Sequence, residues 1–312
     1  QAGMIASDEN LQIERFPVVG LSKTSASDNL ITDSAAGATA MACGIKTYNG
    51  AIGVNAKGKA CKTILEMSEE AGMSTGLVAT STITHATPAS FISHVDQRSK
   101  YEEIALGFLE TDIDLFIGGG KDHFDNRRDG RVLTEEFKNK GYSVIDSLSE
   151  LEKGLPKKLI GLLNPKSMPS VIDGRGDMLP ASSQLAIDLL SANEKGFFLM
   201  VEGSQIDWGG HDNNIEYVVT EMLDFDSVIG AVLDFASKDQ NTLVILTADH
   251  ETGGLTVKGE NILTDSTDFA FSTGGHTPVM VPVFAYGPGA HQFTGVYENT
   301  EIFTKMKMLL GL

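Results

Sequence analysis

The chain has 312 residues, of which 41% are hydrophobic and 21% charged, and its formal net charge is -18. This length and composition are typical of a globular protein with a substantial core, as one large domain or two small ones. The charge excludes nucleic acid and anionic membranes as expected partners, because long-range repulsion opposes both. An anionic substrate would be repelled as well, unless bound cations reverse the field at its site. No apolar run approaches the roughly 20 residues that cross a membrane.

The first informative segment is 27–44, SDNLITDSAAGATAMACG, where a helix is predicted to begin near Ser34 with Asp33 or Thr32 as its cap. A hydroxyl at a helix N-terminus faces free backbone N–H groups, which favour an alkoxide and bind phosphate oxygens. A purely structural N-cap serine has the same pattern, so both interpretations stay open for this segment alone. Cys43 is expected to be a buried free thiol, and whether it pairs with Cys61 is left open.

Apolar, β-branched runs then recur along the chain and lead into loops or helical patterns. Strands are expected within 74–82, 112–120, 157–163, 196–203, 241–250 and 281–289. Helices are expected at 62–71, 102–110, 180–193 and 215–236. This alternation predicts an α/β fold, a large and mostly parallel sheet between two helical layers. The polar stretch 121–180 is interpreted as an irregular insertion at the edge of a single domain that spans 1–312.

Potential metal ligands cluster at the predicted strand ends. Glu202 ends one strand, and Asp207 and His211 follow it, four residues apart and hence on one face of any helical turn. Carboxylate oxygen and imidazole nitrogen together are the ligands of Zn²⁺ and Mg²⁺ sites. An acidic, Gly-rich loop with a chance histidine is the alternative for this segment.

Two further clusters have the same character. Asp249 and His250 are adjacent in TADHETGG, where Gly253 and Gly254 permit the sharp turn that would aim both at one ion. His276 lies in TGGHTP. Each cluster is weak evidence alone, but together they use three of the seven histidines, which favours a shared metal site.

A metal site also offers Ser34 an activator. Serine needs a base or a metal before it can attack, and no Gly-x-Ser-x-Gly elbow is present to indicate a histidine-driven triad. Direct coordination by Zn²⁺ is therefore the simpler activation.

With these segments assembled, the sequence resembles the alkaline phosphatases throughout nearly its whole length. The strings that carry the resemblance, in matching order and spacing, are TDSAAGATAMACGIKTYNGAIGV, THATPASFISHVDQR, VEGSQIDWGGHDNN, TADHETGG and GGHTPVMVPVFAYGPG. The resemblance implies hydrolysis of phosphate monoesters, with broad specificity and an alkaline optimum, by two in-line displacements through a phosphoserine. It also implies inorganic phosphate as product, a homodimer, and a periplasmic or secreted location.

By the same resemblance, each site residue receives a role. Ser34 is implied as the nucleophile and Arg98 as the side chain that grips two phosphate oxygens, a hold that suits a planar guanidinium. Two Zn²⁺ and one Mg²⁺ per chain are implied. The implied ligands are Asp207, His211 and His276 for one zinc, Asp249 and His250 for the second, and Thr87 and Glu202 for magnesium. Considered without the family, Arg98 would rather be a surface ion-pair residue.

Three positions are less defined, and one expected segment is absent. Asp33, His85 and Trp208 are expected to line the phosphate pocket or to lie behind the metal ligands, and His85 and Trp208 vary within the family. The family's first strand ends in Asp-Gly-Met-Gly, whose Asp bridges the second zinc and the magnesium, and this sequence is expected to start just past it. A phosphodiesterase, mutase or sulfatase of the same superfamily, or an inactive phosphate-binding remnant, are the alternatives.

Overall fold

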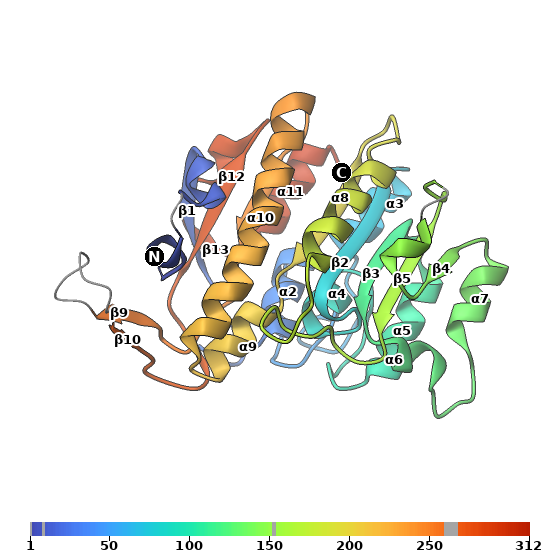
Figure 1. Ribbon diagram of the computed structural model, residues 1–312, viewed down its shortest axis with the longest axis horizontal. Helices are drawn as coiled ribbons and strands as arrows, with labels where there is room; N and C mark the ends of the chain where they lie inside the picture. Colours follow the sequence, from blue (N-terminus) through green and yellow to red (C-terminus); the bar gives the residue numbers. More distant parts are fainter. Residues whose placement is uncertain (1, 8–9, 152–153, 259–267) are drawn as a thin grey trace.

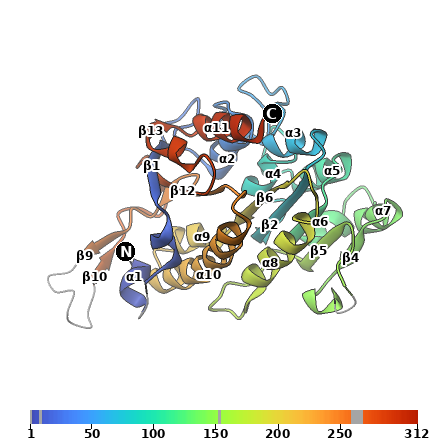
Figure 2. The same ribbon diagram turned by 90° about the horizontal axis from the view of Figure 1, so that it is seen from above.

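The computed structural model describes residues 2–7, 10–151, 154–258 and 268–312. Its architecture is the expected α/β sandwich of three layers, with strands between two sets of helices (Figures 1 and 2). One set of helices packs around α8 (Met178–Leu190) and α10 (Ile215–Asp239). The opposite set is α2 (Ser34–Cys43), α3 (Ile64–Glu70), α4 (Ala86–Ser90) and α11 (Thr300–Leu310).

A five-stranded, wholly parallel sheet forms one half of the central layer. Its order is β4-β5-β3-β2-β6. The bounds are β2 (Ser74–Thr82), β3 (Leu115–Gly119), β4 (Ser143–Ile145), β5 (Leu159–Asn164) and β6 (Phe197–Glu202). In β2 and β3 nearly every residue is buried, because helices cover both faces, and this explains why these strands are continuous apolar runs.

The other half is a four-stranded sheet of mixed direction, in the order β13-β1-β12-β7. Its strands are β1 (Val18–Lys23), β7 (Val244–Thr247), β12 (Val281–Tyr286) and β13 (Gly295–Glu298). β12 runs antiparallel to both neighbours. The expectation that the apolar run 281–289 forms a parallel strand was therefore wrong, because a buried antiparallel strand has the same apolar pattern.

The two sheets end at β6 and β7, and no ladder joins these two strands. Each is the last strand of its sheet, and among the described residues neither pairs on its outer edge. All residues of both strands are partly exposed although most are apolar.

The stretch 121–180 lies at the edge of the parallel sheet and is more regular than expected. It supplies β4 and β5, and it adds α6 (Lys121–Asp125), α7 (Leu133–Asn139) and the 3₁₀ turn η2 (Leu148–Leu151). Its lysines and acids face solvent while Phe124 and Phe137 are buried, so the polar composition concealed β4, α6, α7 and η2. β5 coincides with the strand expected within 157–163.

The remaining elements are short or peripheral. They are α1 (Ala2–Ala6), η1 (Gln12–Arg15), α5 (Tyr101–Glu110), α9 (Gln205–His211), β8 (Glu251–Thr252), β9 (Thr256–Lys258), β10 (Asp268–Ala270), β11 (His276–Thr277) and η3 (Ala290–Phe293). In the part of the chain that the structure describes, no helix is long and apolar enough to span a membrane.

Candidate active site and metal centre

The predicted nucleophile lies at the first position of α2, as the sequence indicated. Asp33 is the N-cap, and its Oδ1 accepts a hydrogen bond of 3.0 Å from the Ala36 N–H. Ser34 is 6% exposed, and its Oγ lies 3.1 Å from Nε2 of His250. A Cβ on Gly37 would come within 3.1 Å of Asp249, so this glycine lets the first turn of α2 approach the end of β7. The Ser34 hydroxyl therefore lies between a helix N-terminus and the histidine cluster.

Three imidazoles converge next to Ser34, each held by its Nδ1. His211 Nδ1 lies 2.8 Å from the Gly274 carbonyl, and His276 Nδ1 lies 2.7 Å from the Thr32 carbonyl. A carbonyl only accepts, so each of these nitrogens must carry the proton. His250 Nδ1 lies 3.2 Å from the Thr252 hydroxyl, which itself donates to Asp207 and so accepts from His250. In neutral form all three rings therefore present an Nε2 lone pair.

These lone pairs face one another and also face carboxylates. Because all of these atoms are acceptors, the arrangement is favourable only when a cation lies between them. His211 Nε2 and His276 Nε2 are 3.2 Å apart, and neither has a proton to donate to the other. Two nitrogen ligands of a tetrahedral zinc, at about 2.0–2.1 Å from the ion, are separated by about 3.3 Å. Ligating atoms of Asp207, His250 and His276 also lie within 4.8 Å of one another. The residues therefore fit a zinc ion.

In the second predicted pair, Asp249 and His250, the carboxylate likewise has no permanently charged cation beside it among the described residues. His250 Nε2 lies 3.2 Å from Asp249 Oδ2, and both side chains are shielded from water. Burial alone would raise the pKa of Asp249, but the nearby His250 holds that pKa down at about 2. Burial, the largest single influence, lowers the pKa of His250, but Asp249 and Asp207 together raise it above its ordinary value, so this ring binds a proton more readily than a free imidazole. A metal ion would compensate the carboxylate in the same place.

Arg98, which is predicted to bind the phosphate, is held from two sides. Its guanidinium donates to Asp33 Oδ2 at 2.9 Å and contacts His85 Nε2 at 3.2 Å. Burial, and secondarily Arg98, lowers the pKa of His85 to about 4, so the ring is neutral at physiological pH. Since His85 Nε2 accepts from Arg98, its Nδ1 carries the proton, and that buried N–H has no partner among the described residues. Arg98 is thus aimed at the site by the same Asp33 that caps the helix of Ser34.

The third group, Glu202 and Thr87, lies at the carboxyl end of β6. Burial raises the pKa of Glu202 to about 7. The Thr87 hydroxyl lies near enough to lower that pKa partly, yet it forms no hydrogen bond of regular geometry and is buried. Ser204 donates to Glu202 Oε2. A carboxylate beside an unsatisfied hydroxyl offers two hard oxygen ligands, which suits Mg²⁺. Trp208 packs against His85 with ring centroids 6.0 Å apart, on the side of the pocket where both were expected.

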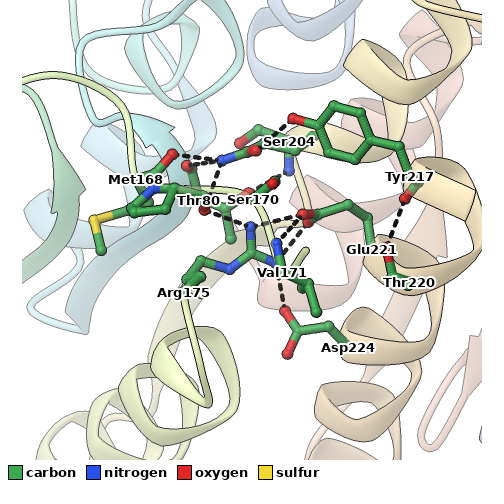
Figure 3. Close-up of polar contacts among 12 residues, drawn as sticks. Thr80, Met168, Ser170, Val171, Arg175, Ser204, Tyr217, Thr220, Glu221 and Asp224 are labelled. Atoms are coloured by element: carbon green, nitrogen blue, oxygen red, sulfur yellow. Dashed lines mark hydrogen bonds and ion pairs between the residues drawn. The ribbon is translucent and has the colours of Figure 1, made fainter. Parts of the chain in front are cut away.

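A buried polar network holds α9, the helix that carries Asp207 and His211. Gln205 begins α9, and its amide donates to the carbonyls of Thr80 at the end of β2 and of Met168 in the preceding loop. Its carbonyl accepts from Tyr217 of α10 at 2.6 Å. Behind them the buried Arg175 pairs with Glu221 and Asp224 of α10 (Figure 3). Because α9 is tied to β2 and to α10, its two predicted metal ligands are positioned by the protein itself.

Sequence reasoning missed two kinds of contributor. Thr252 links Asp207 to His250, and its position two residues after His250 on an extended segment was the available signal. The carbonyls of Thr32 and Gly274 set histidine tautomers, and backbone atoms leave no trace in residue types. The remaining histidines lie elsewhere: His94 pairs with Glu66, His123 contacts Thr84, and His291 is exposed.

The fold and this constellation define a class, an α/β metalloenzyme with a serine hydroxyl at a helix N-terminus beside a cluster of potential metal ligands. The sequence profile of the alkaline phosphatases matches residues 1–270 and 263–312. Alkaline phosphatase 3 of Bacillus subtilis is 38% identical over 350 residues, covering 87% of this chain and 75% of the relative. Alkaline phosphatase of Escherichia coli is 32% identical and covers 96% of this chain and 79% of its own length. The chain belongs to the alkaline phosphatase family, and its reaction is the hydrolysis of phosphate monoesters.

Solved structures agree with this assignment. The alkaline phosphatase of the Antarctic bacterium TAB5 superimposes with a TM-score of 0.94 at 45% identity, covering 99% of this chain and 93% of that one. The enzyme of Thermus thermophilus superimposes with a TM-score of 0.92 at 26% identity, covering 100% and 88%. A metal cofactor follows from the family and from the ligand cluster.

Proposed function

We propose that Ser34 is the nucleophile of this phosphomonoesterase and that two Zn²⁺ and one Mg²⁺ serve it. The observation that carries the proposal is the convergence of three Nε2 lone pairs and two carboxylates beside Ser34 Oγ. Asp207, His211 and His276 are assigned to one zinc, and Asp249 and His250 to the second. Thr87 and Glu202 are assigned to magnesium. A mutant of the TAB5 enzyme was solved with Mg bound in its M3 site, which supports a magnesium position in the family.

The reaction proceeds by two displacements at phosphorus. Ser34 Oγ attacks, its proton leaves, and the bond to the departing alkoxide breaks, which yields a phosphoserine and an alcohol. Water then attacks the phosphoserine and restores the Ser34 hydroxyl with release of inorganic phosphate. When bound, the zinc ions supply Lewis-acid chemistry, lowering the pKa of coordinated hydroxyls and neutralising developing negative charge.

The chain's own residues orient this chemistry. Arg98 offers two parallel N–H donors to phosphate oxygens, and Asp33 fixes its direction through the 2.9 Å ion pair. The N–H groups of the first turn of α2 add positive potential at the phosphorus. Neutral His85 leaves Arg98 without a competing positive charge next to it. Bound cations would also reverse the repulsion that a net charge of -18 imposes on a phosphate ester.

The nucleophile is tested by chemical trapping. The wild-type protein, mixed with an aryl phosphate labelled on phosphorus and quenched in acid, should retain label on Ser34, located by peptide mass spectrometry. Ser34→Ala should retain none and lose at least about 10⁴-fold in kcat/KM. Zinc content serves as the control, because alanine at this position leaves the histidine ligands in place. Label on another residue, or undiminished activity of Ser34→Ala, would refute the proposal.

Assembly and location follow from the resemblance alone. We infer a homodimer in the periplasm or outside the cell. Light scattering of the purified protein and fractionation of the source cells test these two statements. A monomeric mass or a cytoplasmic pool would contradict them.

A further inference from the structure

The only two cysteines of the chain lie side by side outside the active site. Cys43 is the last residue of α2 and is buried, whereas Cys61 is half-buried. Cys43 Sγ lies 3.5 Å from the Cys61 carbonyl oxygen. The proximity of the two thiols, with burial adding to it at Cys43, raises the pKa of Cys43, whereas the neighbouring Cys43 lowers the pKa of Cys61. One thiol is thus accessible and acidified, and a second, shielded thiol is within its reach.

The surroundings favour thiol chemistry over metal binding. His94 lies next to this pair, but its Nδ1 is engaged by the Gly53 carbonyl at 2.7 Å and its Nε2 by Glu66 at 3.0 Å. Among the described residues, the one group of His, Cys, Asp or Glu atoms close enough to hold an ion is at the active site. The Glu66 carboxylate raises the pKa of His94, and a positive imidazole near Cys61 favours its thiolate.

The chain between the two cysteines supports the phosphate-gripping residues. This segment, 44–60, leaves α2 at Cys43 and passes beside the N-terminal end of the same helix. There the Asn49 amide oxygen accepts from the Asp33 N–H at 2.9 Å, and the Gly50 N–H donates to Asp33 Oδ2 at 3.0 Å. The Gly50 carbonyl accepts from the Arg98 N–H at 2.8 Å. The segment then returns to place Cys61 against Cys43.

We propose that Cys43 and Cys61 form an intramolecular disulfide under oxidising conditions, and that this bond staples segment 44–60 around Asp33 and Arg98. The bond would join the C-terminal end of α2 to the segment that forms hydrogen bonds with Asp33, the N-cap residue of the same helix. This inference goes beyond the phosphatase assignment, since the state of the thiols can be measured without activity.

The bond forms by thiol–disulfide exchange with a low-molecular-weight disulfide such as oxidised glutathione. The Cys61 thiolate attacks one sulfur of the reagent and releases one glutathione thiolate. Cys43 then attacks the Cys61 sulfur of the mixed disulfide, which releases the second glutathione, and the proton of Cys43 passes to that leaving thiolate. The protein loses two hydrogens and the reagent gains them, so the exchange balances.

Intact mass spectrometry tests the bond directly. After incubation of the full chain with oxidised glutathione, we expect a mass lower by two hydrogens and no thiol open to alkylation under denaturing conditions. Cys43→Ser should instead stop at the mixed disulfide on Cys61, one glutathionyl group heavier. A wild-type chain that keeps two alkylatable thiols, or that accumulates the mixed disulfide, would overturn the proposal.

Thermal unfolding tests the staple. The oxidised protein should melt about 5 °C higher than the reduced protein, because the bond restricts the unfolded chain over the 18 residues of separation between the cysteines. Cys61→Ser should melt at one temperature with or without the oxidant. Equal melting of oxidised and reduced wild type, at equal metal content, would show that the segment is not stapled.

Discussion

Two clusters of charged side chains adjoin α9, and they differ in whether their opposite charges are paired within the protein. In the cluster of Arg175, Glu221 and Asp224, the guanidinium pairs with both carboxylates, and Glu221 also accepts from the Val171 N–H at 2.8 Å. In the cluster around Ser34, imidazole lone pairs face one another and face carboxylates. The side chains of Arg175 and Glu221 are fully buried, whereas the histidine cluster is partly open to solvent, with the His211 side chain 39% exposed.

The difference teaches how a functional cluster is recognised. Arg175 and its partners compensate one another, which makes a rigid support and leaves no capacity for a ligand. The histidine cluster has more acceptors than donors, and only a cation from outside can balance it. An excess of one kind of polar atom in a buried cluster is therefore the sign of a binding site.

Removal of the Arg175 guanidinium should have the largest effect on stability. Arg175→Met strands Glu221 without its partner, so the free energy of unfolding should fall by about 3–5 kcal/mol. Urea unfolding at fixed zinc concentration measures this. The control is Arg128→Met, since the Arg128 side chain is 91% exposed beside Glu102 and should change stability by less than about 0.5 kcal/mol. If both variants lost the same free energy of unfolding, the buried ion pairs of Arg175 would not be the source of the stability assigned to them.

Removal of one imidazole should act on function instead. His276→Ala takes away one of the facing nitrogens, so zinc affinity and kcat/KM should each fall by at least about 100-fold while folding stability of the metal-free protein is kept or improved. His291→Ala, at an exposed histidine, is the matched control and should match wild type. A His276→Ala protein with normal zinc affinity would mean that this cluster is structural, like that of Arg175.

Arg98→Lys should separate charge from geometry. Lysine keeps the positive charge but loses the fork that reaches Asp33 and two phosphate oxygens, so KM and the inhibition constant of inorganic phosphate should rise by about tenfold. Steady-state kinetics on an aryl phosphate measure both. An unchanged inhibition constant would show that Arg98 acts only as a charge near the site.

The pH dependence of magnesium binding should be the smallest effect. Because burial raises the pKa of Glu202 to about 7, this carboxyl is protonated at pH 6, and Mg²⁺ must displace the proton. The Mg²⁺ dissociation constant should rise up to about tenfold between pH 8 and pH 6 in calorimetric titrations, and Glu202→Gln should abolish the change. In the metal-free protein, protonated Glu202 is compatible with burial, so the folded state is more stable at low pH. This contribution to the free energy of unfolding is lost as the pH rises through about 7 and the buried carboxyl ionises. Binding that is independent of pH would contradict this role of Glu202.

The sequence predicted the layers and the helix of Ser34 because their causes are local. Asp33 caps the helix, and apolar runs such as 74–82 form the buried strands. It could not predict that β12 is antiparallel or that residues 143–145 form a strand beside β5, because direction and pairing depend on contacts between distant segments. The predicted metal ligands could be found from the sequence, because carboxylate and histidine side chains follow the predicted strands. The tautomers were not, since the Thr32 and Gly274 carbonyls that set them belong to the backbone.

The central claim is that the unbalanced histidine cluster is completed by zinc. Anomalous diffraction at the zinc absorption edge, from crystals of the intact protein grown with zinc and phosphate, tests it most directly. The account predicts one zinc peak bonded to Nε2 of His211 and His276, and a second beside Asp249, His250 and Ser34 Oγ. Crystals at full zinc saturation with no peak at either place would contradict it.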